Sequence, residues 1–125
     1  VGSEMCIRDR EYIMKNKTEK FNCPVGITLS LIGGKYKVVI LWYLFDKKIL
    51  RYGELQKILK GVTAKMLIQQ LRELEEDGLV KRKVYPVVPP KVEYSLTELG
   101  ESIIPILLEM KKWGENYTKT YCGEE

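Results

Sequence analysis

The period of the apolar pattern changes at Gly78, and this change limits the folds that the chain can adopt. In residues 63–77, Leu67, Leu71 and Leu74 recur at the spacing of one helical face. In residues 79–84 and 92–96 the apolar residues alternate two by two, which is typical of strands. The segment "YPVVPPK" between them is too rich in proline to pair within a sheet, so it marks a hairpin tip. The sequence therefore predicts a helix followed at once by a β-hairpin.

Three shorter helices are predicted upstream of this unit. Residues 24–32 and 35–46 are separated by Gly33-Gly34, which ends the first of them. Residues 52–61 form a short amphipathic helix that we expect Gly61 to cap, and we expect Thr63 to cap the next helix. Two short helices joined by a glycine-containing turn and followed by a hairpin predict a winged helix-turn-helix, a mainly α fold with a small β-hairpin (α+β).

A long final helix is predicted from Thr97 to residue 121, with a kink at Pro105. An apolar stripe runs along it, made of Leu99, Ile103, Ile106, Leu107, Met110 and Trp113. We assign residues 1–20 to an N-terminal arm, 21–120 to the winged helix with its final helix, and 121–125 to a tail. Residues 1–10 have no amphipathic pattern, so we expect either a non-native extension or a disordered tail and place no function on Cys6.

Charge and cysteine content bound the classes of function. The net charge of +4 is concentrated in residues 33–97, where 13 Lys and Arg exceed 7 Asp and Glu by 6, which favours an anionic partner. The chain has no histidine, its three cysteines are widely spaced, and "IGGK" lacks the rest of a phosphate-binding loop. We therefore expect no enzyme activity, no metal, no cofactor and a reducing cytoplasm. The longest apolar run, residues 38–45, is shorter than the roughly 20 residues that span a bilayer, so no membrane partner is expected.

The outer face of the helix over residues 63–77 is suited to read DNA. With Leu67 at 0°, Lys65, Gln69 and Arg72 fall at about 160°, 200° and 140°, and Ile68 at about 100°. Arginine and lysine donate to guanine, glutamine pairs with adenine, and an apolar side chain contacts the thymine methyl group. Such side chains also cover ordinary surface helices, but the preceding helix, the turn and the basic hairpin favour double-stranded DNA. The predicted recognition-helix residues are Thr63, Lys65, Ile68, Gln69, Gln70 and Arg72.

Contacts to the DNA backbone are expected from the hairpin, or wing, and from the starts of other elements. Side chains alternate between the two faces of a strand, so only some of the lysines and arginines of the wing can face the DNA. We predict that these are Lys83 and Lys91. For each single lysine the alternative is a solvated surface charge. The full set of predicted wing and backbone contacts is Lys35, Lys37, Arg51, Tyr52, Lys83 and Lys91.

Several motifs together resemble the HxlR family of bacterial winged-helix regulators. They include "CPV", "LIGGKYK", "RYGELQK" and the long stretch from Thr63 to Gly100, and the resemblance covers about residues 21–118. It implies a homodimer on a palindromic operator, with the first and last helices at the dimer interface. The interface residues so implied are Ile103, Ile106, Leu107, Met110 and Trp113, although this stripe could also cover the protomer's own core.

The resemblance also marks Cys23 as a candidate redox or electrophile sensor. Several members of the family look like sensors through a cysteine at this position, and a helix start lowers a thiol pKa. Cys23 could instead be a small buried hydrophobe. Two other functions stay open: a regulator with a small aromatic effector at the dimer interface near Tyr36, Trp42 and Trp113, and a winged helix used only for protein association.

Overall fold

The structure, a computed structural model, describes residues 23–122. The arm at residues 1–20, Cys6 and the last three residues of the tail therefore lie outside the described residues. In chain order the elements are α2 (Pro24–Ile32), α3 (Lys37–Lys47), β1 (Leu50–Arg51), α4 (Tyr52–Ile58), α5 (Ala64–Glu76), β2 (Val80–Tyr85), β3 (Lys91–Leu96), α6 (Glu98–Ser102) and α7 (Ile104–Tyr121).

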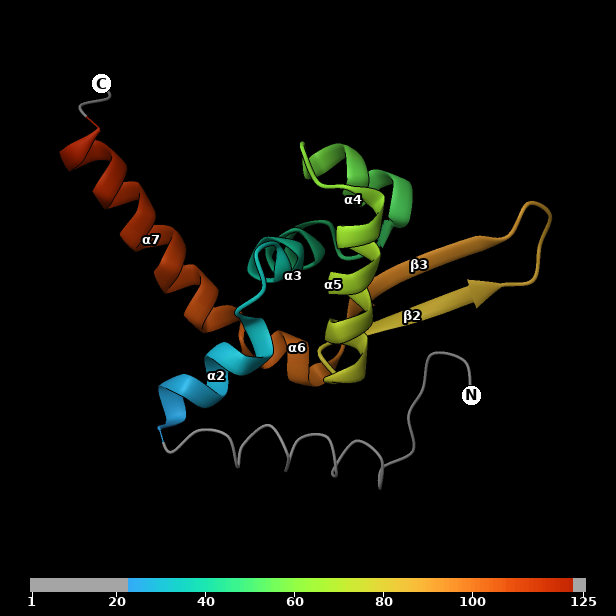
Figure 1. Cartoon of the computed structure of the whole chain (residues 1–125), viewed down its shortest axis with the longest axis horizontal. Helices are drawn as coiled ribbons and strands as arrows, with labels where there is room; N and C mark the ends of the chain where they lie inside the picture. Colours follow the sequence, from blue (N-terminus) through green and yellow to red (C-terminus); the bar gives the residue numbers. More distant parts are fainter. Residues whose placement is uncertain (1–22, 123–125) are drawn as a thin grey trace.

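The helices α3 and α5 lie at the centre, and two long elements project from them in opposite directions (Figure 1). The hairpin of β2 and β3 extends to one side, and α7 extends to the other with α2 near its base. The sheet is antiparallel with strand order β1-β3-β2, and β2 pairs with β3 from Val80↔Leu96 to Tyr85↔Lys91. The third strand, β1, is a two-residue piece that follows α3 and pairs with β3.

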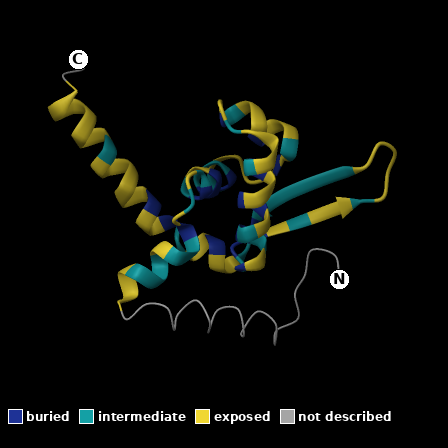
Figure 2. Ribbon diagram, in the orientation of Figure 1, coloured by how far each residue is buried: buried dark blue, intermediate teal, exposed yellow. Residues whose placement is uncertain are grey.

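The core forms where the apolar faces of α3 and α5 meet the sheet and the first turn of α7 (Figure 2). Ile40 and Leu41 of α3 are completely buried, as are Leu67 and Leu74 of α5. This burial places α3 at the centre of the core and seats α5 with its leucines inward. Each such side chain contributes about 1.5–3 kcal/mol by leaving water.

The helix-turn-helix forms at the predicted place, with one change in its turn. α4 ends at Ile58 and its C-cap is Leu59, so Gly61 does not cap the helix. Gly61 lies farther along the turn with φ 87°, a conformation that favours glycine. Thr63 caps α5 as predicted.

The long final helix is divided into α6 and α7, which corrects the single kinked helix predicted from the sequence. α6 ends at Ser102, Ile103 lies at the break, and Pro105 falls in the first turn of α7. A proline is tolerated there because a first-turn N–H has no partner within the helix. The residue therefore begins a helix rather than bending one.

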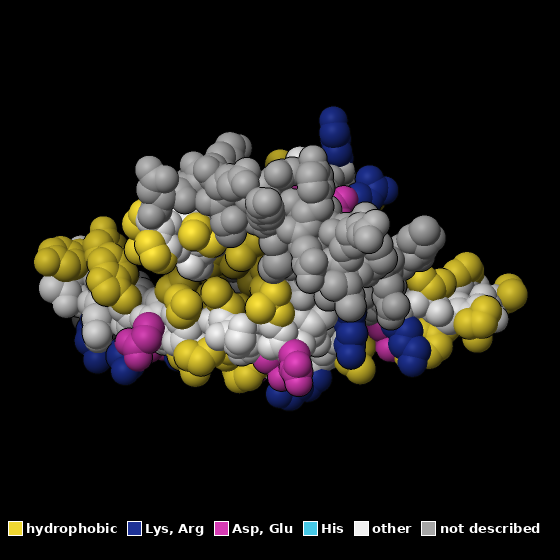
Figure 3. All heavy atoms as spheres, turned by 90° about the horizontal axis from the view of Figure 1, so that it is seen from below, with side chains coloured by type: hydrophobic (Ala, Val, Ile, Leu, Met, Phe, Trp, Pro, Cys, Tyr) yellow, Lys and Arg dark blue, Asp and Glu magenta, His cyan; other side chains and the backbone are white. Residues whose placement is uncertain are grey.

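The predicted dimer stripe is divided between the core and the surface. Leu107 is 2% exposed within the protomer, and Ile103 packs against the core. Ile106, Met110 and Trp113 are exposed. Figure 3 shows hydrophobic side chains gathered on the left of the molecule, where α2 and α7 lie. Within residues 23–122 no one helix has the length and hydropathy needed to cross a membrane; α2 and α3 meet that test only as a pair, bent by 73°.

Candidate nucleic-acid interface

α5 has one buried and one exposed face. The helix begins at Thr63, whose Oγ1 accepts a hydrogen bond from the backbone N–H of Met66 at 3.0 Å. Its leucines are buried, while an opposite set of side chains is exposed and lines one shallow hollow. This set, which we call the α5 reading face, consists of Lys65, Ile68, Gln69 and Arg72.

Charge is graded along this face. Lys65 lies in the first turn of α5, where unpaired backbone N–H groups favour an anion. Glu73 and Glu76 line the far part of the same hollow. The end of α5 nearest the helix-turn-helix turn is therefore the end better suited to a phosphate.

A second hollow separates α5 from the hairpin and places Tyr52 beside the reading face. We call it the helix–wing hollow, and its lining residues are Tyr52, Ile68, Leu71, Arg72, Glu75, Arg82, Val92 and Tyr94. Ile68 and Arg72 line both hollows, so the two lie next to each other. Two arginines and two tyrosines thus line one space together with Glu75, and guanidinium and hydroxyl donors suit phosphate oxygens.

An ion pair connects the wing to α5 across this hollow. Arg82 Nε lies 3.6 Å from Glu75 Oε1, and Glu75 Oε2 is buried without a hydrogen bond. Burial raises the pKa of the Glu75 carboxyl, and the opposing effect of Arg82 is smaller. Burial likewise raises the pKa of the Tyr94 hydroxyl. Folding therefore disfavours the ionised form of the Glu75 carboxyl relative to its protonated form.

Arg82 and Tyr94 are absent from the sites predicted from the sequence. Side chains two residues apart on a strand share a face, so Arg82 lies on the same face as Val80, which is 2% exposed in the core. The register pairs Arg82 with Tyr94 and brings both to the helix–wing hollow. The buried start of β2 was the signal that could have identified Arg82.

The same alternation places Lys83 and Lys91, the predicted phosphate contacts, away from the helix–wing hollow. Both lie on the sheet face opposite Arg82, where their Nζ atoms are 5.0 Å and 4.9 Å from the centre of the Tyr85 ring. Lys91 is also 3.4 Å from Glu93, which accepts a hydrogen bond from the Tyr85 hydroxyl. These two lysines therefore do not join the reading face. The exposed Arg51 pairs with Glu93 in the register and lies on the same far side.

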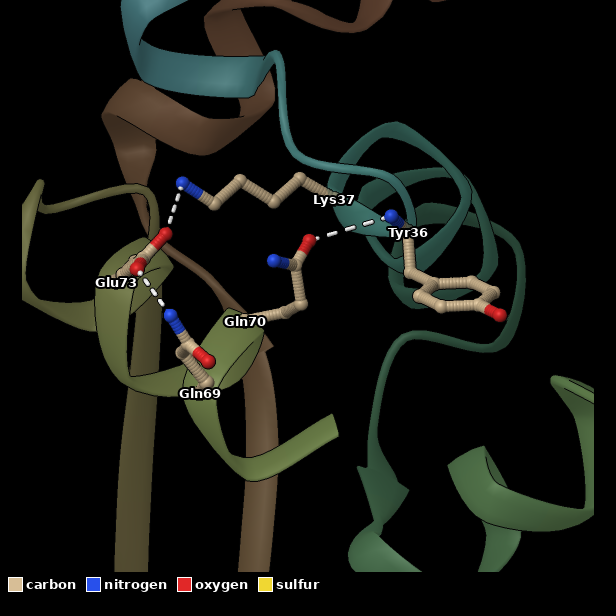
Figure 4. A network of polar contacts seen from close by, with 5 residues as sticks. All are labelled: Tyr36, Lys37, Gln69, Gln70 and Glu73. Atoms are coloured by element: carbon tan, nitrogen blue, oxygen red, sulfur yellow. Dashed lines mark hydrogen bonds and ion pairs between the residues drawn. The ribbon is translucent and has the colours of Figure 1, made fainter. Parts of the chain in front are cut away.

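Two other predicted contacts point inward, which Figure 4 shows. Gln70 is 6% exposed, and its Oε1 accepts a hydrogen bond from the backbone N–H of Tyr36 at 3.2 Å. Lys37 is 5% exposed, and its Nζ lies 2.6 Å from Glu73 Oε1. Both side chains therefore lie where α3 packs against α5, away from the exposed reading face. Lys35, two residues earlier, stays exposed.

Cys23 is the exposed N-cap residue of α2, not a buried hydrophobe. The neutral side chain forms no capping hydrogen bond of ordinary geometry. The backbone N–H groups of Gly26 and then Val25 nevertheless lower the pKa of the Cys23 thiol, because they stabilise its thiolate. The second described cysteine, Cys122, is also exposed, at the end of α7.

The aromatic residues considered for an effector site have different surroundings. Tyr36 and Trp42 pack against the core, and the Trp42 ring lies 5.7 Å from that of Phe45. Trp113 is exposed on α7 and stacks on Tyr117 at 5.4 Å. Within residues 23–122, no group of three His, Cys, Asp or Glu side chains could hold a metal ion.

Comparison with known families and sequences finds similarity to helix-turn-helix regulators of transcription. The model of the family described as HxlR-like helix-turn-helix matches residues 31–121. The chain is 48% identical over 112 residues to the uncharacterized HTH-type transcriptional regulator YdeP of Bacillus subtilis (strain 168), which covers 89% of this chain and 87% of YdeP.

Solved structures of redox-responsive proteins are similar as well. The oxidised form of the redox regulator HypR is 52% identical with a TM-score of 0.72, covering 75% of this chain and 96% of that one. Its reduced form is 47% identical with a TM-score of 0.76, covering 82% and 100%. Diamide-treated YodB of B. subtilis is 33% identical with a TM-score of 0.63, covering 76% and 94%. The winged helix-turn-helix fold predicted from the sequence is thereby confirmed.

Proposed function

Because this chain belongs to the HxlR-like helix-turn-helix family of DNA-binding transcriptional regulators, we propose that it reads a palindromic operator as a homodimer and responds to oxidants or electrophiles through Cys23. The family and the named relatives are regulators of transcription and not enzymes. The protein would act in the cytoplasm, where bacterial operators are found. Residues 21–120 would form the functional unit.

The observation that carries DNA reading is the division of α5 into two faces. Its leucines are buried in the core, whereas the other face exposes Lys65, Ile68, Gln69 and Arg72 together. Within residues 23–122, none of the four side chains in this set is buried by the packing of the protomer. Its donors and its one apolar group match the base edges of a major groove.

Backbone contacts would come from the residues around this face. Arg82 and Tyr52 line the helix–wing hollow beside Arg72, and Lys35 is exposed outside it. A phosphate held in the hollow would fix the angle between α5 and the wing on the duplex. In this arrangement Arg82 takes the role that the sequence had suggested for Lys83 and Lys91.

The exposed apolar surface of α7 supports a homodimer. Ile106, Met110, Trp113, Tyr117 and Tyr121 recur every three or four residues, so they share one face. Their exposed fractions run from 46% to 75%, and we call this set the α7 stripe. A surface of this kind marks an interaction site, and Val25 and Leu29 of α2 add to it, at 67% and 57% exposure. A two-fold dimer would place its reading helices roughly 34 Å apart, one turn of DNA.

A sensing role for Cys23 is supported by its exposure and its lowered pKa. The thiolate is the nucleophilic form of cysteine, so such a residue reacts preferentially with electrophiles and oxidants. Cys23 begins α2, which carries part of the exposed apolar surface. Modification there would alter the dimer and, through it, the spacing of the two reading helices.

Selection of bound sites from a random double-stranded DNA library tests the DNA-reading part. With the reduced full chain at physiological salt, we expect a palindrome whose half-sites lie about ten base pairs apart. Lys65→Ala and Arg72→Ala should each weaken binding to it by about tenfold or more. No enrichment by folded, dimeric, reduced protein would overturn the proposal and favour a winged helix that only associates with proteins.

The sensing part is tested on the selected operator. An oxidant or electrophile should release the wild-type protein from DNA and leave Cys23→Ser bound. If Cys23→Ser ignores oxidants but still releases DNA when a small aromatic compound is added, the effector alternative replaces the sensor. Oxidant release that survives in Cys23→Ser would exclude Cys23 as the sensor.

A further inference from the structure

A buried lysine is connected to the α5 reading face through one glutamate (Figure 4). Lys37 Nζ lies 2.6 Å from Glu73 Oε1. The other oxygen of this carboxylate, Oε2, accepts a hydrogen bond from Gln69 Nε2 at 3.3 Å. The side chain of Lys37 is 6% exposed and that of Glu73 38%, while Gln69 is exposed. The contacts therefore run from the interior to the surface that would meet DNA.

The chemistry of these contacts determines which way the amide of Gln69 faces. An ionised carboxylate only accepts hydrogen bonds, so the amide nitrogen, not the oxygen, must face Glu73. One N–H of the amide is used there. The second N–H and Oε1 remain available on the exposed side, as one donor beside one acceptor. That pair matches the N7 acceptor and the N6 amino group of adenine in the major groove.

Glu73 can hold the Gln69 amide in one orientation only if a second partner fixes the position of its own carboxylate. A hydrogen bond between exposed side chains four residues apart on one helix is weak and readily exchanged for water. The contact with Lys37 is short and charge-assisted, and its lysine end is buried, so it restrains the position of the carboxylate. The lysine comes from the start of α3, an element packed in the core, and is therefore itself held in place.

We propose that Lys37 is a positioning residue for base recognition, which acts through Glu73 to orient the amide of Gln69 toward adenine. This inference rests on the proposed function, because it concerns how the same reading face selects a base. Lys37 does not touch DNA in this arrangement. The sequence had suggested a phosphate contact for Lys37, and the two roles predict different measurements.

Site selection with three proteins separates these roles: the wild type, Lys37→Met and Lys35→Met. Methionine fills the buried path of the lysine without its charge, and Lys35 is the exposed lysine two residues away. Gln69→Ala first identifies the base pair that Gln69 meets. At that pair we expect Lys37→Met to reduce the preference for adenine at least about fivefold, with an unchanged dependence of affinity on salt. Lys35→Met should leave the adenine preference intact.

A double variant keeps the test valid if Lys37→Met folds poorly. Lys37→Met/Glu73→Ala removes both members of the pair, so no unpaired charge is left buried. It should show the same loss of adenine preference. An unchanged preference in the folded single or double variant would overturn the inference. So would a decrease of about 0.9 in the slope of log affinity against log salt for Lys37→Met, because that marks a phosphate contact.

The design distinguishes failure of this inference from failure of the proposed function. If the folded wild-type protein selects no sequence, the proposed function fails and the inference falls with it. If the wild type selects a palindrome and Gln69→Ala selects the same one, DNA reading stands and the inference alone is wrong.

Discussion

A Cβ atom on Gly34 would lie 2.4 Å from Oε1 of Gln70, so these two residues share a space that only glycine leaves open. The same oxygen accepts the backbone N–H of Tyr36. The buried amide of Gln70 on α5 thus packs directly against the turn between α2 and α3. This contact joins α5 to the start of α3 on the side of the helix away from the reading face.

Gly34→Ala should destabilise the protein by about 1–3 kcal/mol, because the new methyl group displaces Gln70 and breaks its hydrogen bond. Urea unfolding measures the loss. Gly53→Ala is the matched control: a Cβ there has no atom within 4 Å, and Gly53 lies in α4. It should stabilise the protein by about 0.5–1 kcal/mol. Equal effects of the two substitutions would contradict the close contact at Gly34.

Arg82→Gln and Lys83→Gln should differ, although the residues are adjacent on β2. Only Arg82 lines the helix–wing hollow, so its loss should reduce the salt slope of operator binding by about 0.9, the value for one phosphate. Lys83→Gln should leave the slope unchanged. Titrations at several salt concentrations on the selected operator measure both, with thermal unfolding as the check that each variant folds. The reverse ranking would restore the assignment made from the sequence.

Trp113→Glu should convert the protein from a dimer to a monomer. It places a charge in the middle of the α7 stripe, where burial against a second copy would be costly. Lys112→Glu, on an exposed position of the same helix outside the stripe, controls for the added negative charge. Sedimentation velocity gives the oligomeric state. A dimer that persists in Trp113→Glu would place the interface elsewhere.

Cys23 should be alkylated at lower pH in the folded than in the unfolded protein. Its thiol pKa is lowered at the start of α2, and only the thiolate reacts. The rate of reaction with iodoacetamide, measured against pH in a Cys6→Ser/Cys122→Ser background, should reach half its maximum at lower pH without urea than with it. The opposite order would remove the physical basis for a sensor at this residue.

Glu75→Gln should gain stability relative to the wild type as the pH rises from about 4, the ordinary range of a glutamate. The folded chain holds the Glu75 proton more tightly than the unfolded chain, because burial raises its pKa. The wild type therefore loses stability as the pH rises through this window, whereas glutamine has no proton to release. Urea unfolding at several pH values measures the trend, with the exposed Glu76→Gln as the control for charge. A constant difference between Glu75→Gln and the wild type would contradict it.

Local spacing was sufficient to predict the helix-turn-helix and the hairpin, although not the division of the final helix into α6 and α7. The change of period at Gly78 predicted a helix followed by a hairpin, and the cap at Thr63 fixed where that helix begins. The outward direction of Lys65, Gln69 and Arg72 also followed from spacing alone, because three leucines had to face the core. These features depend on neighbours within a few residues, which a sequence displays directly.

The tertiary structure decided which of the remaining polar side chains are available. Spacing placed Gln70 at the edge of the buried face, and only the packing of α3 against α5 encloses it. Lys37 resembles a surface cation in the sequence until Glu73 of a distant helix is seen beside it. Alternation along β2 allowed either Arg82 or Lys83 to face α5, and the burial of Val80 selected Arg82. Each choice depends on contacts between segments far apart in the chain, which local periodicity does not specify.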